Sequence, residues 1–146
     1  EKQARVLGLT KNQILFLGHV PPKTLYEFMR AFDICAMPFP WNKHYAYIMS
    51  PLKMFEYMAS KNPIIATDLP SVNEILCHKK NAYLVKPGDP KDLAEGIDSL
   101  LKNTKLSQLI AKNAFQTVAQ KFTWKNRAEK IISAISRQYS DQFLAK

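Results

Sequence analysis

The chain has 146 residues, of which 47% are hydrophobic and 23% charged, and its formal net charge is +9. This length predicts one domain, and this composition excludes a disordered polypeptide. No apolar run approaches the roughly 20 residues that a membrane-spanning helix needs. The basic residues are scattered without a block of five or more, so they favour anionic ligands in general over a nucleic-acid-binding surface.

Short apolar runs alternate with amphipathic stretches along the chain, which is the pattern of strands alternating with helices. The run over residues 13–18 predicts a buried strand, and apolar residues at helical spacing predict a helix over 22–31. A second strand is expected over 33–37. The segment that follows, roughly 38–49, is a long loop rich in aromatic residues, and loops of this length are usually functional or mobile.

The second half continues the alternation. A helix is expected from Pro51 to about Ser60, followed by a strand over residues 63–67. Ser71 and Glu74 have the spacing of a capping box, which predicts the start of a short helix. The remaining predicted elements are a strand over 82–86, a helix capped by Asp89 with Pro90 in its first position, and helices over about 105–120 and 124–139, the last capped by Thr123. Its apolar stripe is Ala128, Ile131, Ile132 and Ile135.

Repeated strand–helix units predict an α/β fold, with a Rossmann-like parallel sheet, flanking helices and right-handed crossovers. Ligands of such sheets bind beyond the carboxyl ends of the strands. Three loops are predicted at that edge, over residues 18–21, 38–50 and 68–71. The binding site is therefore expected among these loops.

The most distinctive local feature is the predicted helix start at Ser50, Pro51, Leu52 and Lys53. Ser50 suits the N-cap and Pro51 the first helical position, which puts Lys53 in the first turn, where a cation opposes the helix dipole. An anion bound at the helix start would explain this lysine, because free backbone N–H groups, the dipole and an ammonium together form a phosphate site. The alternative is that Lys53 extends to solvent and pairs with Glu56.

Two further features suggest contacts to a nucleotide. Glu56 stands among apolar residues in the sequence, where a carboxylate needs partners such as the two hydroxyls of a ribose. The alternative is an ordinary glutamate on the polar face of the helix. Gly18, His19 and Val20 form a turn after the first predicted strand, and its backbone could bind the edge of a nucleobase. The alternative there is an ordinary connection between a strand and a helix.

Several familiar site patterns are absent from the sequence. It contains neither the dinucleotide-binding nor the phosphate-binding glycine motif, and its histidines and cysteines lack the spacing of metal ligands. Cys35 and Cys77 are expected to be reduced thiols, because neither the charged residues 1–8 nor anything else indicates export. We therefore expect a cytoplasmic protein that needs no metal and no cofactor.

Residues 50–76 strongly resemble the donor-site segment of glycosyltransferase family 4. The resemblance extends over residues 14–20, 81–90 and 122–124, and so covers nearly the whole chain. It implies a GT-B fold, in which two Rossmann-like domains enclose the substrates. It also implies transfer of a sugar from a nucleotide sugar, usually with retention at the anomeric carbon and without a metal.

Carried over to this sequence, the resemblance implies that Glu56 holds the donor ribose and that the backbone of residues 50–52 approaches the diphosphate. Residues 18–20 match the turn that touches the nucleobase. The implied donor is a UDP- or GDP-sugar, and the implied acceptor is a glycan, a lipid-linked glycan or a glycolipid. Peripheral association with the inner face of the membrane would fit such an acceptor and the net positive charge, whereas nucleic acid is not an expected partner.

Two features depart from the family pattern. Ile48 stands where the family's first motif glutamate contacts the transferred sugar, which leaves that contact open. Two strands of the family's C-terminal domain, and its whole N-terminal acceptor domain, have no counterpart in the chain. We therefore predict that residues 1–146 form a partial C-terminal, nucleotide-sugar-binding domain that binds donor weakly and transfers no sugar alone.

Two other functions fit the sequence less fully. A non-catalytic nucleotide-binding module would bind nucleotide and never consume nucleotide sugar. A charge-driven nucleic-acid-binding domain would lose affinity steeply with salt and would be insensitive to Glu56→Ala.

Overall fold

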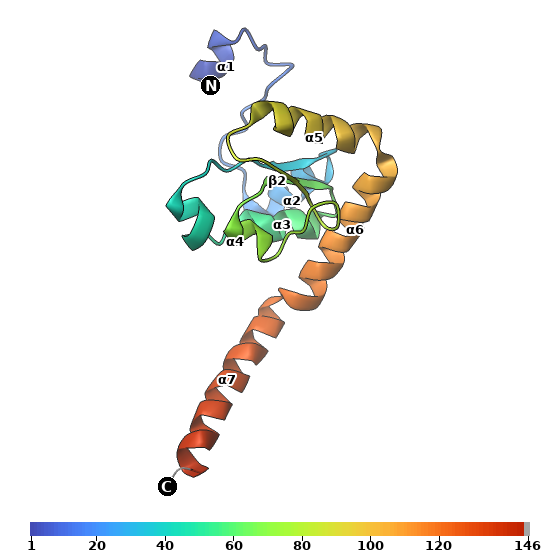
Figure 1. Cartoon of the computed structure of the whole chain (residues 1–146). Coiled ribbons are helices and arrows are strands. Elements are labelled where there is room, and N and C mark those ends of the chain that lie inside the picture. Colours follow the sequence, from blue (N-terminus) through green and yellow to red (C-terminus); the bar gives the residue numbers. More distant parts are fainter. Residues whose placement is uncertain (145–146) are drawn as a thin grey trace.

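The computed structural model describes residues 1–144, with side chains up to residue 137. Its centre is a parallel sheet with the strand order β1–β2–β3 (Figure 1). The strands are β1 (Cys35–Met37), β2 (Ile64–Thr67) and β3 (Tyr83–Val85). Cys35 is aligned with Ile64, and Ile65 with Tyr83. The predicted α/β class and parallel sheet are confirmed.

Seven α-helices and one π-helical turn accompany the sheet in the described part of the chain. They are α1 (Lys2–Val6), α2 (Pro22–Arg30), the π-helical turn η1 (His44–Ile48), α3 (Leu52–Ser60), α4 (Pro70–Asn73), α5 (Pro90–Lys102), α6 (Thr104–Lys121) and α7 (Trp124–Leu144). The predicted helices are present, and α7 is longer than expected. The predicted loop over 38–49 contains η1, so part of it is helical.

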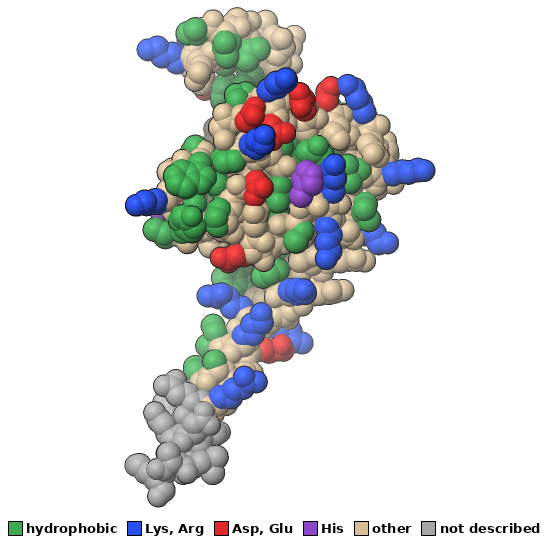
Figure 2. All heavy atoms as spheres, viewed as in Figure 1, with side chains coloured by type: hydrophobic (Ala, Val, Ile, Leu, Met, Phe, Trp, Pro, Cys, Tyr) green, Lys and Arg blue, Asp and Glu red, His purple; other side chains and the backbone are tan. Residues whose placement is uncertain are grey.

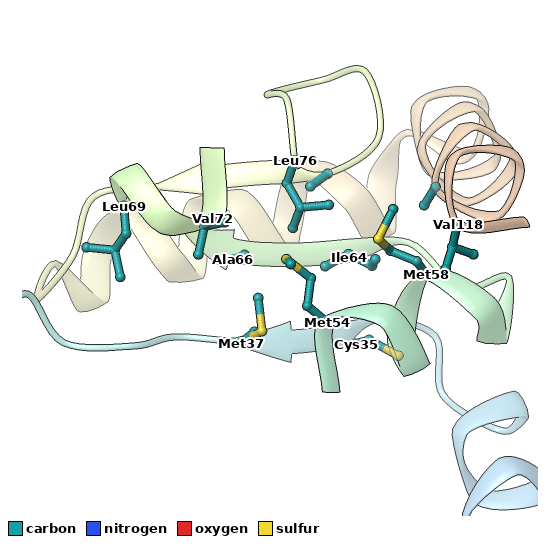
Figure 3. Packing of buried hydrophobic residues seen from close by; sticks show 12 residues of the cluster. Cys35, Met37, Met54, Met58, Ile64, Ala66, Leu69, Val72, Leu76 and Val118 are labelled. Atoms are coloured by element: carbon teal, nitrogen blue, oxygen red, sulfur yellow. The ribbon is translucent and has the colours of Figure 1, made fainter. Parts of the chain in front are cut away.

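The two faces of the sheet pack against different helices. Because successive residues of a strand point to opposite faces, Ile64 and Ala66 enter one core and Ile65 enters another. The larger core lies between the sheet and helices α3, α4 and α6 (Figure 3). It consists of Cys35, Met37, Met54, Met58, Ile64, Ala66, Leu69, Val72, Leu76, Ala82, Ala114 and Val118. Met54 and Met58 fix α3 through one face, so the opposite face of this helix is left to solvent.

Helix α5 lies on the other face of the sheet and approaches it closely at Gly96. A Cβ atom at this position would lie 2.7 Å from Cδ1 of Ile65 and 3.0 Å from atoms of Tyr83 and Val85. Any side chain here would therefore force the side chains of Ile65, Tyr83 and Val85, or the helix itself, to shift. Glycine is needed here for close packing rather than for an unusual backbone angle.

Two predicted helix caps are confirmed. The carboxylate of Asp89 accepts hydrogen bonds from the backbone N–H groups of Lys91 and Asp92, at 3.1 and 3.0 Å. The hydroxyl of Thr123 accepts one from the N–H of Asn126 at 3.1 Å. Both residues satisfy donors that the first turn of a helix leaves free.

The start of α3 is shifted by one residue from the prediction. Pro51, not Ser50, is the N-cap, because its φ of −75° and ψ of 119° are extended rather than helical. Leu52 is therefore the first helical residue and Lys53 the second. No described side chain caps this helix.

The capping box predicted at Ser71 and Glu74 is also wrong. Helix α4 already begins at Pro70, whose ring favours the first helical position, and Leu69 is its N-cap. The hydroxyl of Ser71 instead donates a hydrogen bond to the carbonyl oxygen of Tyr45 at 2.6 Å. A contact between distant segments has taken the place of the local cap.

The strand predicted over residues 13–18 is absent. The segment is irregular, and its apolar side chains are exposed, with 71% exposure for Leu15 and 50% for Phe16. A strand requires a neighbour for its backbone N–H and C=O groups. Within the described residues no strand pairs with this segment, so its apolar pattern is not buried.

Helix α7 extends away from the sheet (Figure 1). Ile131, Ile132 and Ile135 have the predicted helical spacing but are exposed. Among the described helices, none combines the length and the apolar character required to cross a membrane.

Candidate functional site

The carboxyl ends of the three strands lie at one edge of the sheet, because all of them are parallel. The segments that leave this edge are residues 38–51, 68–69 and 86–89. Two of the predicted loops, 38–50 and 68–71, are therefore at the expected edge. The loop over 18–21 is not, because no strand leads into it.

The long segment after β1 is fixed to this edge by tertiary contacts. The N–H of Phe39 donates to the hydroxyl of Thr67 at 3.1 Å, and Ser71 holds the carbonyl of Tyr45. The rings of Phe39 and Tyr45 stack with their centroids 5.1 Å apart. These contacts position the chain just before α3 relative to the ends of β1 and β2.

The first turn of α3 offers unused backbone donors. The N–H of Met54 donates to the carbonyl of Pro51 at 3.1 Å, which closes the first turn. No side chain among the described residues caps the N–H groups of Leu52 and Lys53. Such donors, together with the positive end of the helix dipole, suit an anion.

Lys53 is half-buried beside this helix start. Its ammonium lies 4.4 Å from the centroid of the Phe39 ring, a cation–π contact. The ion pairs among the described residues join Lys91 to Glu95, Lys102 to Asp98 and Lys125 to Glu129. The alternative in which Lys53 pairs with Glu56 is therefore not found in this structure.

Glu56 lies on the solvent-facing side of α3, one turn after Leu52. The expectation of an apolar environment for its carboxylate is wrong, because the apolar residues next to it in sequence point elsewhere. Met54 and Met58 turn into the core, whereas residues 52 and 56 share the exposed face. The carboxylate is thus open to a ligand that approaches the start of the helix.

The turn at Gly18, His19 and Val20 stands apart from this cluster. Gly18 has a φ of 67°, which suits a tight turn, and His19 is exposed. Within the described residues, no hydrogen bond joins this turn to α3. The structure brings together residues 50–53 and Glu56, and it does not bring residues 18–20 to them.

A hollow of about 230 Å³ lies at the same edge and was not expected from the sequence. Its walls come from residues 38–40 after β1, from Thr67, and from Val85, Lys86, Gly88, Asp89, Pro90 and Leu93. The loop after β3 contributes through Gly88, whose φ is 75°. The signal was present in the run Lys86, Pro87, Gly88, Asp89 and Pro90, a turn directly after a predicted strand.

The cysteines take no part in this site. Cys35 and Cys77 are free thiols, and Cys35 lies at the amino end of β1, opposite the strand ends just described. Burial raises the pKa of the Cys35 thiol, while hydrogen bonds with Ser60 and Asn62 lower it in part. In the described part of the chain, no group of three or more His, Cys, Asp and Glu residues could hold a metal ion.

Comparison with known proteins gives consistent matches. The family model for group 1 glycosyl transferases matches residues 1–103. An uncharacterized glycosyltransferase of Methanocaldococcus jannaschii is 26% identical over 84% of this chain and 30% of its own length. A D-inositol 3-phosphate glycosyltransferase of Corynebacterium urealyticum is 26% identical over 90% of this chain and 29% of its own length. The chain spans about a third of the length of such curated relatives.

Solved structures of group 1 glycosyl transferases and related proteins are also similar to this chain. The C-terminal domain of a group 1 glycosyl transferase from Francisella tularensis superposes with a TM-score of 0.68 at 30% identity, over 84% of this chain and 60% of that one. Anabaena HepE in complex with UDP-glucose superposes with a TM-score of 0.75 at 26% identity, over 93% of this chain and 35% of that one. The three-stranded sheet and its helices therefore correspond to a known type of domain.

Proposed function

The chain belongs to the group 1 glycosyl transferases and has the fold of a GT-B C-terminal domain, and from that premise we propose that it binds the nucleotide-sugar donor of a retaining glycosyltransferase. The observation that carries the proposal is the start of α3. Uncapped N–H groups, the ammonium of Lys53 and the open carboxylate of Glu56 lie together there, beside the carboxyl ends of the strands.

The proposed roles follow from the order of groups along a nucleotide sugar. The diphosphate would bind the backbone N–H groups of Leu52 and Lys53, close to the backbone of Ser50 and Pro51, which leads into the helix. The Lys53 ammonium would add a positive charge. The ribose would lie one helical turn further, about 5.4 Å along the axis, where Glu56 accepts hydrogen bonds from its hydroxyls. A nucleobase contact by residues 18–20 stays a prediction without support from the contacts of this structure.

The chemistry proposed for these residues is stabilisation of the leaving diphosphate. Negative charge grows on that group as the bond to the sugar breaks, and the helix dipole with Lys53 would stabilise it without a metal. The acceptor-binding and remaining catalytic groups are not among the residues identified in this chain. We propose that these 146 residues alone do not transfer sugar.

The donor class we favour is a UDP- or GDP-linked hexose. A UDP-sugar has support from Anabaena HepE, whose structure contains UDP-glucose. The proposed acceptor is a glycan, a lipid-linked glycan or a glycolipid, in polysaccharide biosynthesis at the cytoplasmic face of a membrane.

A non-catalytic nucleotide-binding module is a second candidate, favoured by Ile48. This residue stands at the end of η1 beside the proposed donor site and presents an apolar side chain where the family resemblance implies a carboxylate. Both candidates predict nucleotide binding. They differ in whether nucleotide sugar is ever consumed when an acceptor is supplied.

A thermal-shift experiment tests the donor site. The chain is heated with UDP-, GDP-, ADP- and dTDP-sugars, beside Glu56→Ala and the control Glu95→Ala, which removes another exposed helical glutamate. A ligand that binds only the folded state raises the midpoint by mass action. We expect a rise for one nucleotide class that is lost in Glu56→Ala and kept in Glu95→Ala. Because residues 1–146 alone are expected to bind donor weakly, each ligand is titrated far into the millimolar range, and no rise with any nucleotide sugar there would refute the donor site.

A further inference from the structure

Helix α6 crosses the amino-terminal edge of the sheet, which is the edge opposite the proposed donor site. Leu106 and Ile110 pack in the smaller core, on the side of α5. Ala114 and Val118, one and two turns further, pack in the larger core on the side of α3. The helix therefore passes from one face of the sheet to the other, and its remaining face is open to solvent.

The segments that lead into β2 and β3 lie against α6 and bring lysines to it. The ammonium of Lys61 is 4.5 Å from the centroid of the Phe115 ring, and the amide of Asn113 donates to the carbonyl of Lys80 at 2.8 Å. In Figure 2, basic side chains follow α6 on the visible face of the molecule. We name five exposed residues the α6 basic band: Lys61, Lys79, Lys80, Lys105 and Lys112.

Two lysines of the band have an unusual backbone conformation. Lys61 and Lys79 have φ angles of 66° and 56°, and among the described residues other than glycine they alone have a positive φ. Glycine or asparagine adopts this left-handed region at less cost than lysine does. The ammonium of Lys79 also lies over an aromatic ring, 5.9 Å from the centroid of Tyr83. Lysine at both positions is therefore better explained by its charge than by its backbone.

The band has no acidic counterpart in the described part of the chain. The ion pairs found there involve other lysines. In the sequence, residues 57–67, 75–88 and 99–128 contain neither Asp nor Glu. The surface around α6 thus has a potential of one sign, which attracts an anionic partner and favours its association.

The side chains between the lysines indicate which kind of anion fits. Gln108, Gln116 and Gln120 are exposed and share a row of α6 with Lys112 at i+4 spacing. Their amides both donate and accept, as the peptide groups of an extended chain require. The rings of Phe115 and Tyr83 lie under ammonium groups, so they are not free to stack on nucleobases. This combination favours a polypeptide over a nucleic acid.

We propose that the α6 basic band docks an extended acidic segment of a partner protein. Carboxylates of the segment would pair with the lysines, and its backbone would lie along the glutamine row of α6. Because the band is at the amino-terminal edge of the sheet, the docked partner leaves the start of α3 open. The contact does not depend on the proposed donor site and can be measured without a nucleotide sugar.

A double substitution at the two left-handed lysines tests the band. Lys61→Asn with Lys79→Asn removes both charges, and asparagine tolerates the left-handed backbone, so the thermal midpoint should stay the same or rise. Affinity for a fluorescein-labelled oligoglutamate peptide, measured by anisotropy at low ionic strength, should fall about fivefold. The control Lys23→Gln with Lys91→Gln removes the same charge outside the band and should change the affinity less than about twofold.

A second variant keeps the proposal testable if the first one unfolds. Lys80→Gln with Lys112→Gln alters no left-handed position and should also weaken peptide binding about fivefold. Equal weakening by the control pair would reduce the effect to net charge and overturn the proposal, as would the absence of saturable binding. Tighter binding of a single-stranded oligonucleotide or of phosphatidylglycerol vesicles would also overturn it. The thermal shift with nucleotide sugars should be the same in all these variants, so failure of either proposal leaves the other standing.

Discussion

Strand β2 and residues 14–17 are apolar runs of the same length in opposite environments. Ile64, Ile65 and Ala66 of β2 have no exposed surface, since strands lie on both sides of them and helices on both faces. Leu15, by contrast, is 71% exposed in a segment without a neighbouring strand. The difference teaches that an apolar run becomes part of a core only where other elements supply its hydrogen bonds and its packing.

The largest expected effect tests this contrast directly. Ile65→Ala removes a side chain that is packed between β2 and α5, and it should lower the free energy of unfolding by about 2–5 kcal/mol. Leu15→Ala should change it by less than about 0.5 kcal/mol, because the side chain is already in water. Urea denaturation followed by circular dichroism measures both. Equal effects of the two substitutions would show that the segment 14–17 is buried in solution.

The next largest effect tests how closely α5 packs against β2 and β3. Gly96→Ala adds one carbon against Ile65, Tyr83 and Val85, and we expect a destabilisation of about 1–3 kcal/mol despite the better helix propensity of alanine. Ala94→Ser, at an exposed position of the same helix, is the control and should be close to neutral. A stabilised Gly96→Ala variant would mean that α5 does not pack closely on the sheet.

The starts of α5 and α3 also differ in their local contacts, and the expected effect on stability is smaller. Asp89 caps α5 through two backbone hydrogen bonds, so Asp89→Ala should cost about 1 kcal/mol, and Asp89→Asn should restore most of it. Ser50 caps nothing in this structure, so Ser50→Ala should leave the stability nearly unchanged. Thermal denaturation compares the variants. A comparable loss for Ser50→Ala would place the N-cap of α3 at Ser50 after all.

The two thiols give the smallest effect on stability. Burial raises the pKa of Cys35 in the folded state, so the unfolded thiol ionises first and the free energy of unfolding falls as pH rises above about 8.5. Below that pH the contribution is fully present. Cys35→Ala should flatten this part of the pH profile, whereas Cys77→Ala should not, because Cys77 is exposed. An unchanged slope in Cys35→Ala would assign the pH dependence to other groups, such as Tyr57, whose pKa burial also raises.

Local patterns predicted the parts of the fold that depend on local forces. Helical spacing gave α2, α5, α6 and α7, and the caps Asp89 and Thr123 follow from short-range hydrogen bonds. The short apolar runs at 63–67 and 82–86 gave β2 and β3, because Pro63 and the turn after residue 86 mark their limits.

The predictions from the sequence are wrong where distant residues, or small differences in backbone angles, determine the local structure. Ser71 bonds to Tyr45, which lies far from it in sequence, and the extended ψ of Pro51 moves the start of α3 by one residue. Glu56 has apolar neighbours in sequence, but the helical turn separates it from them in space. The hollow at the strand ends needed the relative positions of three loops, which no single stretch of sequence contains.

The ring beneath Lys53 affects the entropy of ligand binding. A free lysine side chain samples many rotamers, and ordering it on a bound anion costs up to about 1.5–2 kcal/mol. The contact with Phe39 at 4.4 Å already restricts Lys53 to a few of those rotamers, next to the start of α3. Part of the conformational entropy of Lys53 is therefore lost during folding and not during ligand binding. Phe39 in this way preorganises the site without having to contact the ligand.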